Sequence, residues 1–204
     1  MPQGRFIVLD GPDGCGKTTQ ARLLCHAITR MGREVRHLRE PGGTPIGERV
    51  REILLDPAHE EMSVRTELLL YMASRAQLVE QVIRPALAEG AVVICERFLS
   101  SSVVYQGMAG GLGVAPVLQL GRVAVGGLAP DLTIVLDVDP ATGLARLGRD
   151  PDRMERKAIG FHRAVRAGFR ALARDDPKRV KRISARGDPA AVHVRVLREV
   201  RRRL

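Results

Sequence analysis

The sequence predicts an α/β fold in which a parallel sheet lies between two layers of helices. Five short apolar runs alternate with segments of helical periodicity, and this alternation is typical of parallel sheets covered on both faces. A glycine-rich phosphate-binding motif follows the first apolar run and precedes a helical pattern, as nucleotide-binding α/β proteins require. With 204 residues and 45% apolar composition, the chain has enough material for one domain with a sizeable core.

Hydrophobic periodicity locates the elements. The expected strands cover residues 6–10, 34–38, 91–95, 132–138 and 179–184. Residues 64–89 carry apolar or small side chains at spacings of three and four, which predicts a long helix that Pro85 should kink or begin to end. We expect the glycine-rich residues 107–113 to form a loop. Because no repeat or flexible linker divides the chain, residues 1–204 are expected to form a single domain.

Charge and composition narrow the classes of partner. The net charge of +10 indicates a polyanionic partner, which includes nucleic acids, membrane surfaces and phosphorylated small molecules. Aromatic residues make up only 3% of the chain, so a stacking platform for single-stranded nucleic acid is poorly supplied. A nucleic-acid partner is therefore disfavoured.

The sequence also indicates where the chain works. No run approaches the roughly 18 apolar residues that span a bilayer, and the chain enters its first strand without a signal-peptide pattern. Cys15, Cys25 and Cys95 are odd in number and lack metal-ligand spacing, so reduced thiols are favoured over a zinc site or disulfides. We expect a cytoplasmic protein with no membrane partner.

The phosphate-binding motif occupies residues 11–18 and fits G-x-x-x-x-G-K-[ST]. Its glycines let backbone amides surround the β-phosphate, Lys17 reaches the β- and γ-phosphates, and the hydroxyl of Thr18 binds Mg²⁺. The expected ATP-binding residues are Gly11, Pro12, Asp13, Gly14, Cys15, Gly16, Lys17, Thr18 and Thr19. The chain lacks the N-K-x-D element of GTPases and is short for a motor ATPase, so a compact kinase is favoured.

Five segments in register along nearly the whole chain resemble the bacterial type of the thymidylate kinase family. They are LDGPDGCGKTT, LREPGGTPIGERVREILL, LLLYMASRAQLVEQVIRPAL, ERFLSSSVVYQG and DRMERKAIGFHRAVRAGF. The resemblance implies a P-loop αβα fold with strand order 2-3-1-4-5 and a mobile lid at about residues 143–157. It further implies transfer of the γ-phosphoryl group of ATP to dTMP, and a homodimer formed through helices that include the long one.

The same resemblance implies roles for the acceptor residues. Tyr71 and Arg75 share one helix face because they are four residues apart, and in the family these positions stack on thymine and bond a base carbonyl. Arg97 follows a buried strand and matches the arginine on the acceptor phosphate. Ser102 matches a position on the base edge, and Tyr105 one that crowds the sugar C2′.

Four further acceptor candidates are carried over from matching positions. Ser101 and Gln106 lie on the same segment as the base-edge serine. Arg51 follows the segment 39–44 that resembles the family's wrap around the monophosphate, and it is the arginine expected to contact the acceptor. Asp13 matches an acidic position near the acceptor sugar and the metal.

The lid and the metal site complete the expected chemistry. No basic residue occupies positions 12–15, so the arginine that stabilises the transferring phosphoryl must come from elsewhere, and Arg149 and Arg153 of the lid-like segment, beside Arg146, are the candidates. Together with Lys17, Arg97 and Asp13 they form the expected catalytic set.

The family usually has Glu-Gly and Asp-Arg where this chain has Asp10-Gly11 and Glu96-Arg97. If their strands are neighbours, Asp10, Glu96 and Thr18 would surround one Mg²⁺.

Two alternative functions remain open at this point. One is a kinase for another deoxypyrimidine monophosphate such as dUMP, because one methyl group discriminates by only about 1–3 kcal/mol. The other is a non-catalytic P-loop protein that binds nucleic acid, which the +10 charge favours and which predicts salt-sensitive binding without turnover. The complete acceptor and lid segments favour the kinase for dTMP.

Overall fold

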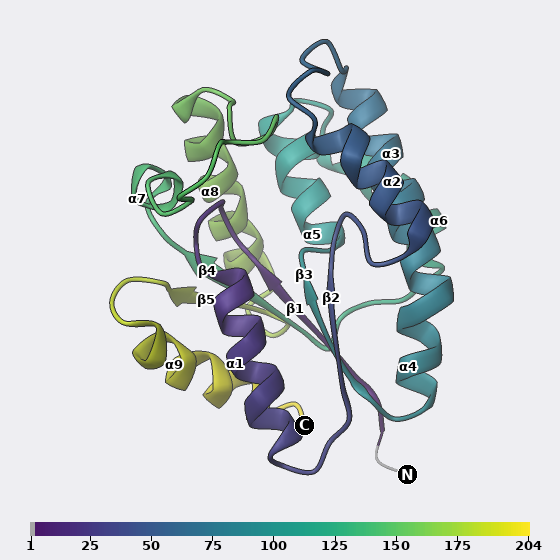
Figure 1. The fold of residues 1–204 in the computed structure, drawn as a ribbon, viewed down its shortest axis with the longest axis vertical. Helices are drawn as coiled ribbons and strands as arrows, with labels where there is room; N and C mark the ends of the chain where they lie inside the picture. Colours follow the sequence, from purple (N-terminus) through teal and green to yellow (C-terminus); the bar gives the residue numbers. More distant parts are fainter. Residues whose placement is uncertain (1–2) are drawn as a thin grey trace.

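The computed structural model describes residues 3–204 and contains the predicted five-stranded parallel sheet (Figure 1). The strand order is β2-β3-β1-β4-β5, which confirms the order that the family resemblance implied. The strands are β1 (Arg5–Asp10), β2 (Val35–Arg39), β3 (Val92–Glu96), β4 (Leu132–Asp137) and β5 (Val180–Ser184). Each of the five predicted strands is present, with bounds shifted by about one residue.

Strand register brings two carboxylates to one edge of the sheet. β1 pairs with β3 so that Leu9 lies opposite Glu96, and Asp10 is the next residue of β1. Strands β3 and β4 are buried along their whole length, which explains their nearly continuous apolar composition. Because carboxyl ends of parallel strands meet at one edge, Asp10 and Glu96 are neighbours there, as their proposed shared site requires.

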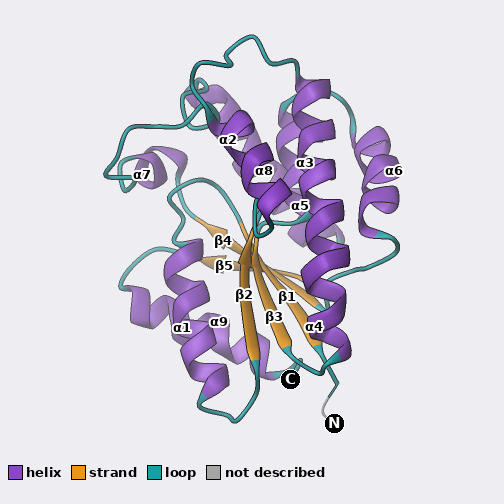
Figure 2. Ribbon diagram, turned by 45° about the vertical axis from the view of Figure 1, so that its right-hand side comes forward, coloured by secondary structure: helices purple, strands orange, loops and turns teal. Residues whose placement is uncertain are grey.

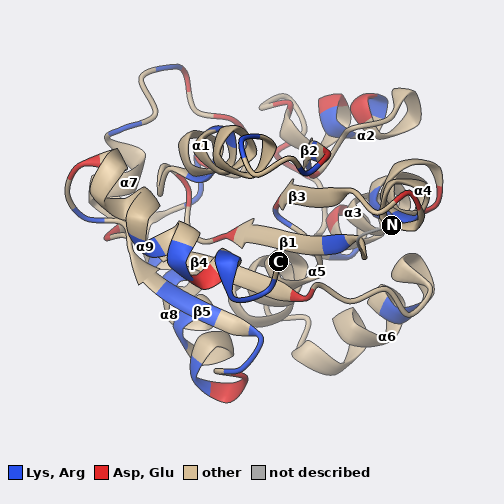
Figure 3. Cartoon of the chain, turned by 90° about the horizontal axis from the view of Figure 1, so that it is seen from below, with Lys and Arg blue, Asp and Glu red and all other residues tan. Residues whose placement is uncertain are grey.

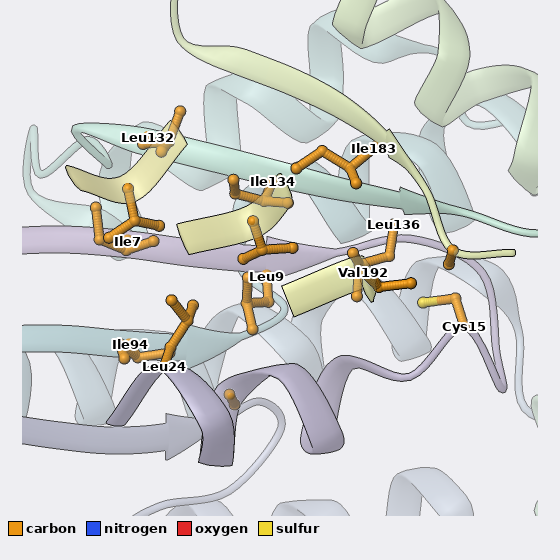
Figure 4. Close-up of a cluster of buried hydrophobic side chains, with 14 of the residues drawn as sticks. Ile7, Leu9, Cys15, Leu24, Ile94, Leu132, Ile134, Leu136, Ile183 and Val192 are labelled. Atoms are coloured by element: carbon orange, nitrogen blue, oxygen red, sulfur yellow. The ribbon is translucent and has the colours of Figure 1, made fainter. Parts of the chain in front are cut away.

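Helices cover both faces of the sheet (Figure 2). One face packs against α1 (Lys17–Thr29) and α9 (Pro189–Arg201), and Figure 4 shows Leu24 and Val192 of these helices beside Ile7, Leu9 and Ile134. The opposite face packs against α3 (Val64–Leu78), α6 (Val114–Val125) and α8 (Ile159–Asp175). The shorter helices α2 (Pro45–Leu55), α5 (Leu99–Ser102) and α7 (Pro140–Leu144) surround the carboxyl edge of the sheet.

The long helix is interrupted close to the expected position. After α3 the chain continues as a π-helical segment, η1 (Val79–Ile83), and then as α4 (Arg84–Ala88). Pro85 has no amide hydrogen for the α-helical bond to the carbonyl four residues earlier, so the regular ladder cannot pass through it unchanged. The helix ends at Ala88, which agrees with the expected disturbance at Pro85.

The loop prediction for residues 107–113 is partly wrong. The π-helical segment η2 (Val103–Ala109) includes the first three of these residues, and the loop begins only after it. Val103, Val104 and Tyr105 are buried against neighbouring helices, so their packing extends the helix through Gly107 despite the low helix propensity of glycine. Within residues 3–204, no helix is long and apolar enough to cross a membrane.

Positive charge gathers in the last quarter of the chain. Residues 156–204 carry 16 of the 33 Lys and Arg but only 4 of the 23 Asp and Glu. Figure 3 shows many of these basic residues around β5, α8 and the carboxyl terminus. Some pair internally, because Arg166, Arg170 and Arg182 all donate hydrogen bonds to Asp137. The excess of +10 is therefore mainly a property of this region rather than of the whole surface.

Candidate active site

A cavity of about 560 Å³ opens at the carboxyl edge of the sheet. Its walls come from the glycine-rich loop, α2, α3, α5, η2, the segment between α7 and α8, and the start of α9. The predicted site residues that line it are Asp13, Gly14, Cys15, Gly16, Lys17, Thr18, Thr19, Arg51, Tyr71, Arg75, Arg97, Ser101, Ser102, Tyr105, Gln106 and Arg149. The lining does not include five other predicted site residues, which are Asp10, Gly11, Pro12, Glu96 and Arg153.

The glycine-rich loop is shaped by positions that exclude a side chain. A Cβ atom at Gly14, where φ is +66°, would lie 1.8 Å from the carbonyl oxygen of Gly143. Gly16 has φ of 93° and is the N-cap of α1, and Gly16, Lys17 and Thr18 at this helix end all line the cavity. Lys17 donates from Nζ to the carbonyl of Pro12 at 2.9 Å. Free helix amides and an ammonium group are the donors with which proteins bind anions, so the loop has the chemistry of such a site.

Arg97 is held beside this loop in a strained conformation. Its φ of 68° is the one positive value among the described non-glycine residues. It forms an ion pair with Asp13, donates to Ser101 Oγ at 3.3 Å and lies 5.0 Å from the ring centre of Tyr105. Tyr105 donates its hydroxyl to Asp13 at 2.9 Å. A residue keeps a strained backbone of this kind only where many surrounding contacts hold it in place, and such residues cluster at functional sites.

The charges of Arg97 and Asp13 support each other. Burial by itself raises the pKa of Asp13, but the nearby Arg97 and Lys17 lower it overall. Burial by itself lowers the pKa of Arg97, but Tyr105, Asp13 and Asp10 raise it well above its ordinary value. Both groups are therefore ionised at neutral pH, and the guanidinium keeps a fixed orientation toward the cavity.

Tyr71 and Arg75 project from one face of α3 into the same cavity, as their spacing predicted. Arg75 is 1% exposed and donates to Ser102 Oγ at 3.1 Å and to Glu40 Oε2 at 2.8 Å. The other carboxylate oxygen of Glu40 is buried without a hydrogen-bond partner. Burial raises the pKa of Glu40, and Arg75 opposes that rise only in part.

Glu40 is a cavity residue that the sequence argument did not single out. The family resemblance assigns the segment 39–44 as a whole to the acceptor phosphate, whereas in the structure the Glu40 carboxylate pairs with Arg75 of α3. The sequence feature that could have indicated Glu40 is an acidic residue directly after a predicted strand, between Arg39 and Pro41. Arg51 lines the cavity from α2 and donates to the carbonyl of Pro41 at 2.9 Å.

Asp10 and Glu96 are neighbours but have different partners. Both oxygens of the fully buried Asp10 accept hydroxyl hydrogen bonds at 2.6 Å, from Ser100 and Ser101. Glu96 accepts from Thr18 Oγ1 at 2.6 Å, and its other oxygen lies 2.9 Å from His37 Nε2. Burial by itself raises the pKa of Glu96, but the hydrogen bonds from His37 and Thr18 lower it overall.

The donor set of Thr18 and Glu96 fits a magnesium ion. Mg²⁺ prefers hard oxygen ligands and is commonly held by one or two protein groups together with phosphate oxygens. Thr18 and Glu96 supply two oxygens beside the glycine-rich loop. Among residues 3–204, no group of three or more His, Cys, Asp or Glu residues could hold a metal ion, so an ion here would need phosphate oxygens and water to complete its shell.

The two lid arginines have different environments. Arg149 lines the cavity, has a side chain 55% exposed and forms an ion pair with Glu155 at 2.7 Å. Arg153 is buried, pairs with Glu67 at 2.6 Å and donates to the carbonyl of Leu54. Arg153 is thus held away from the cavity by its partners, whereas Arg149 and Arg146 face it. The segment lies between α7 and α8, within the predicted lid.

One end of the cavity was missed entirely by the sequence argument. Beyond Thr19 the walls are formed by Gln20, Ala185, Gly187, Pro189 and Val192. Gln20 donates from Nε2 to the carbonyl of Pro189 at 2.9 Å, which joins α1 to the start of α9. The available signal was the position of this connection after the last strand, since open α/β sheets bind ligands at that edge.

Comparisons with known proteins agree on one family. A family model described as thymidylate kinase matches residues 9–196. The thymidylate kinase of Pelotomaculum thermopropionicum is 49% identical over 199 residues, which cover 96% of this chain and 92% of that protein. The thymidylate kinase of Deinococcus radiodurans is 51% identical over 181 residues, covering 88% and 87%. The crystal structure of thymidylate kinase from Ehrlichia chaffeensis superposes with a TM-score of 0.83 at 30% identity, covering 98% and 100%.

Proposed function

The chain belongs to the thymidylate kinase family, and from this premise we propose how its cavity transfers the γ-phosphoryl group of ATP to dTMP. The enzyme is an ATP:dTMP phosphotransferase of dTDP biosynthesis. The observation that carries the assignment of residues is that one cavity joins the anion-binding loop to Tyr71, Arg75 and Arg97. Donor and acceptor phosphates therefore have room to meet within it.

The donor would lie along α1 and the glycine-rich loop. Its phosphates accept hydrogen bonds from the loop amides and from Lys17, because the amino end of α1 and the ammonium group are the nearest donors. The adenine would occupy the end of the cavity walled by Ala185, Gly187 and Val192, because these residues offer apolar surface to a base.

Mg²⁺ would be held by Thr18 and Glu96. Bound there, it would neutralise charge on the β- and γ-phosphates of ATP. Asp10 stays behind this pair and holds the hydroxyls of Ser100 and Ser101, so it orients the loop that carries Arg97. Asp10 on β1 and Glu96 on β3 therefore have different roles: Glu96 would bind the metal, whereas Asp10 would not.

The acceptor would bind with its base on α3 and its phosphate toward the loop. Tyr71 provides a π-face for thymine, and Arg75 donates to a base carbonyl while Ser102 and Gln106 face the base edge. Tyr105 would crowd the sugar C2′ and disfavour a ribonucleotide. Asp13 holds both Tyr105 and Arg97, and so couples the sugar contact to the phosphate contact.

Arg97 and Arg51 would bind the acceptor phosphate from two sides. Ser101 accepts a hydrogen bond from Arg97 and donates to Asp10, which keeps the guanidinium aimed at the cavity. Arg51 reaches the same region from α2. Two arginines at one phosphate supply charge-assisted hydrogen bonds that fix its orientation for attack.

The chemistry then depends on positioning and charge. The dTMP phosphate has lost its second proton at neutral pH because that pKa is about 6, so no general base is required. Lys17, Arg97 and Arg149 stabilise the charge that spreads over the transferring group. Arg149 takes this role rather than Arg153 because Arg149 lines the cavity and Arg153 does not. Closure of the lid keeps water from accepting the phosphoryl group.

A coupled assay for ADP release tests the acceptor assignment. We expect turnover with dTMP to exceed turnover with dUMP, dCMP, UMP, AMP and GMP. Lys17→Ala should abolish it, whereas Lys178→Ala, which removes an exposed lysine after α8, should not. Equal turnover with dUMP would transfer the assignment to a broader pyrimidine kinase. Salt-sensitive DNA binding without turnover would support the nucleic-acid alternative, which the family does not favour.

We also propose a cytoplasmic homodimer. Leu69 on α3 and Val123 on α6 are 55% and 82% exposed, although both helices carry buried residues on their other faces. A second copy of the chain would cover these apolar groups. Sedimentation analysis should report a dimer, and Val123→Glu should dissociate it. The cytoplasm is where both charged nucleotide substrates are available, and cell fractionation tests that placement.

A further inference from the structure

Glu67 is a buried carboxylate that the proposed mechanism does not use. It lies on α3 one helical turn before Tyr71 and is 1% exposed. One carboxylate oxygen accepts from Gln106 Nε2 at 2.7 Å, and the other accepts from Arg153 Nη2 at 2.6 Å. Lys157 Nζ lies 3.7 Å from the second oxygen. Glu67 itself does not line the cavity, but Gln106 and Tyr71 do.

The partners of Glu67 come from separate elements. Gln106 belongs to η2, whereas Arg153 and Lys157 belong to the lid. A buried charge costs several kcal/mol unless it is paired, so α3, η2 and the lid must keep their mutual positions to satisfy this carboxylate. A shift of either the acceptor helix or the lid would break a hydrogen bond to it.

Arg153 extends the connection to two other parts of the site. Its Nε donates to the carbonyl of Leu54 at 2.8 Å, and its amide donates to the carbonyl of Leu55. These carbonyls end α2, the helix that carries Arg51. Helix carboxyl ends leave carbonyls that need such donors. One arginine therefore holds both acceptor helices.

The lid side of the connection leads to Arg149. Asp152, adjacent to Arg153, donates its amide to Glu155 Oε2 at 2.9 Å, and Glu155 donates its amide to Asp152 Oδ1 at 3.0 Å. Glu155 accepts from Arg149 at 2.7 Å. Hydrogen bonds thus lead from Gln106 at the cavity through Glu67 to Arg153, and from its chain neighbour Asp152 through Glu155 to Arg149, which lines the cavity.

We propose that Glu67 and Arg153 are positioning residues that couple occupancy of the acceptor pocket to the position of the donor lid. A base bound by Tyr71 and Gln106 fixes the positions of α3 and η2, so that Glu67 stays hydrogen-bonded to Arg153. Arg153 in turn fixes the position of the lid, and Arg149 then points toward the bound donor. This inference rests on the proposed role of Arg149. Linkage requires that each nucleotide then strengthens the binding of the other.

Calorimetry with a non-hydrolysable ATP analogue tests this coupling in the full-length protein. For wild type, we expect the analogue to bind about 5-fold or more tightly with saturating dTMP than without it, a typical coupling factor. Arg153→Met keeps the aliphatic length of the side chain but removes its hydrogen bonds, so this ratio should fall to near one. Arg153→Lys, which can still pair with Glu67, should recover part of the ratio.

Arg166→Met is the matched control. Arg166 of α8 forms an ion pair of 2.7 Å with Asp137, the last residue of β4, and Asp137 keeps its bonds to Arg170 when Arg166 is removed. This variant should retain the wild-type ratio. A wild-type ratio of one, an unchanged ratio in Arg153→Met or an equal loss in Arg166→Met would each overturn the proposal.

A second variant keeps the test decisive if Arg153→Met does not fold. Glu67→Gln can still accept from Gln106 but offers Arg153 no charge, so its ratio should also approach one, and an unchanged ratio overturns the proposal. The role of Arg149 is tested separately by turnover. If Arg149→Met keeps the wild-type kcat, the proposed lid chemistry fails, while the binding ratio still reports on the coupling.

Discussion

Asp13→Asn tests the negative charge that pairs with Arg97 in the proposed phosphate site. An asparagine can still accept from Arg97 through Oδ1, and its amide can donate to the hydroxyl of Tyr105, so both hydrogen bonds are retained in altered form. What disappears is the negative charge beside Arg97, whose side chain is only 19% exposed. The substitution therefore measures an electrostatic contribution with little change in shape.

The expected loss of stability is about 2 kcal/mol at neutral pH. Hydrogen bonds to charged groups contribute about 1.5–3 kcal/mol each, which sets the scale. Asp10 lies 3.9 Å from Arg97 and compensates part of the lost charge, so the upper end of that range is not expected. Urea denaturation measures the difference, and Asp175→Asn, which changes an exposed ion pair, should cost less than about 0.5 kcal/mol.

The pH dependence has a definite sign. The folded protein lowers the pKa of Asp13, so the carboxylate contributes stability that is complete above its ordinary pKa and is lost as pH falls through the folded value. The difference between wild type and Asp13→Asn should stay constant down to about pH 4 and shrink below it. A difference under about 0.5 kcal/mol at neutral pH, or one that grows in acid, would refute this account.

Further substitutions test other parts of the site. Glu40→Gln should cost about 3 kcal/mol and raise KM for dTMP more than KM for ATP, because it leaves the buried Arg75 without a counter-charge; equal changes in both KM values would contradict this. Gly14→Ala should abolish ATP binding and lower the melting temperature, since its Cβ would lie 1.8 Å from the carbonyl oxygen of Gly143. Gly16→Ala should lower the melting temperature less, because the space around its Cβ is open. Glu96→Gln should raise the Mg²⁺ concentration for half-maximal turnover, and a chelator should abolish turnover; an unchanged magnesium dependence would exclude Glu96 as a ligand. The whole chain should unfold in one calorimetric transition if it is a single domain, and two resolved transitions would reject that expectation.

The sequence by itself determined the elements whose shape depends on local backbone rules. Strand alternation predicted the parallel sheet, and its order came with the family resemblance. The motif at residues 11–18 predicted a turn between a strand and a helix, and β1 ends at Asp10 while α1 begins at Lys17. Tyr71 and Arg75 could be assigned to one face because four residues is about one helical turn. Such features need only the chain's own geometry, so they follow from residue order.

Only the tertiary structure decided which partner each charged side chain takes. Arg149 and Arg153 are alike in sequence, yet Glu67 of a distant helix buries one of them while the other faces the cavity. Asp10 and Glu96 end neighbouring strands, yet Asp10 accepts hydrogen bonds from serine hydroxyls whereas Glu96 accepts one from Thr18. A long flexible arginine side chain can reach several carboxylates. The packing of the helices decides which carboxylate it pairs with, because a buried charge left unpaired would destabilise the fold too much.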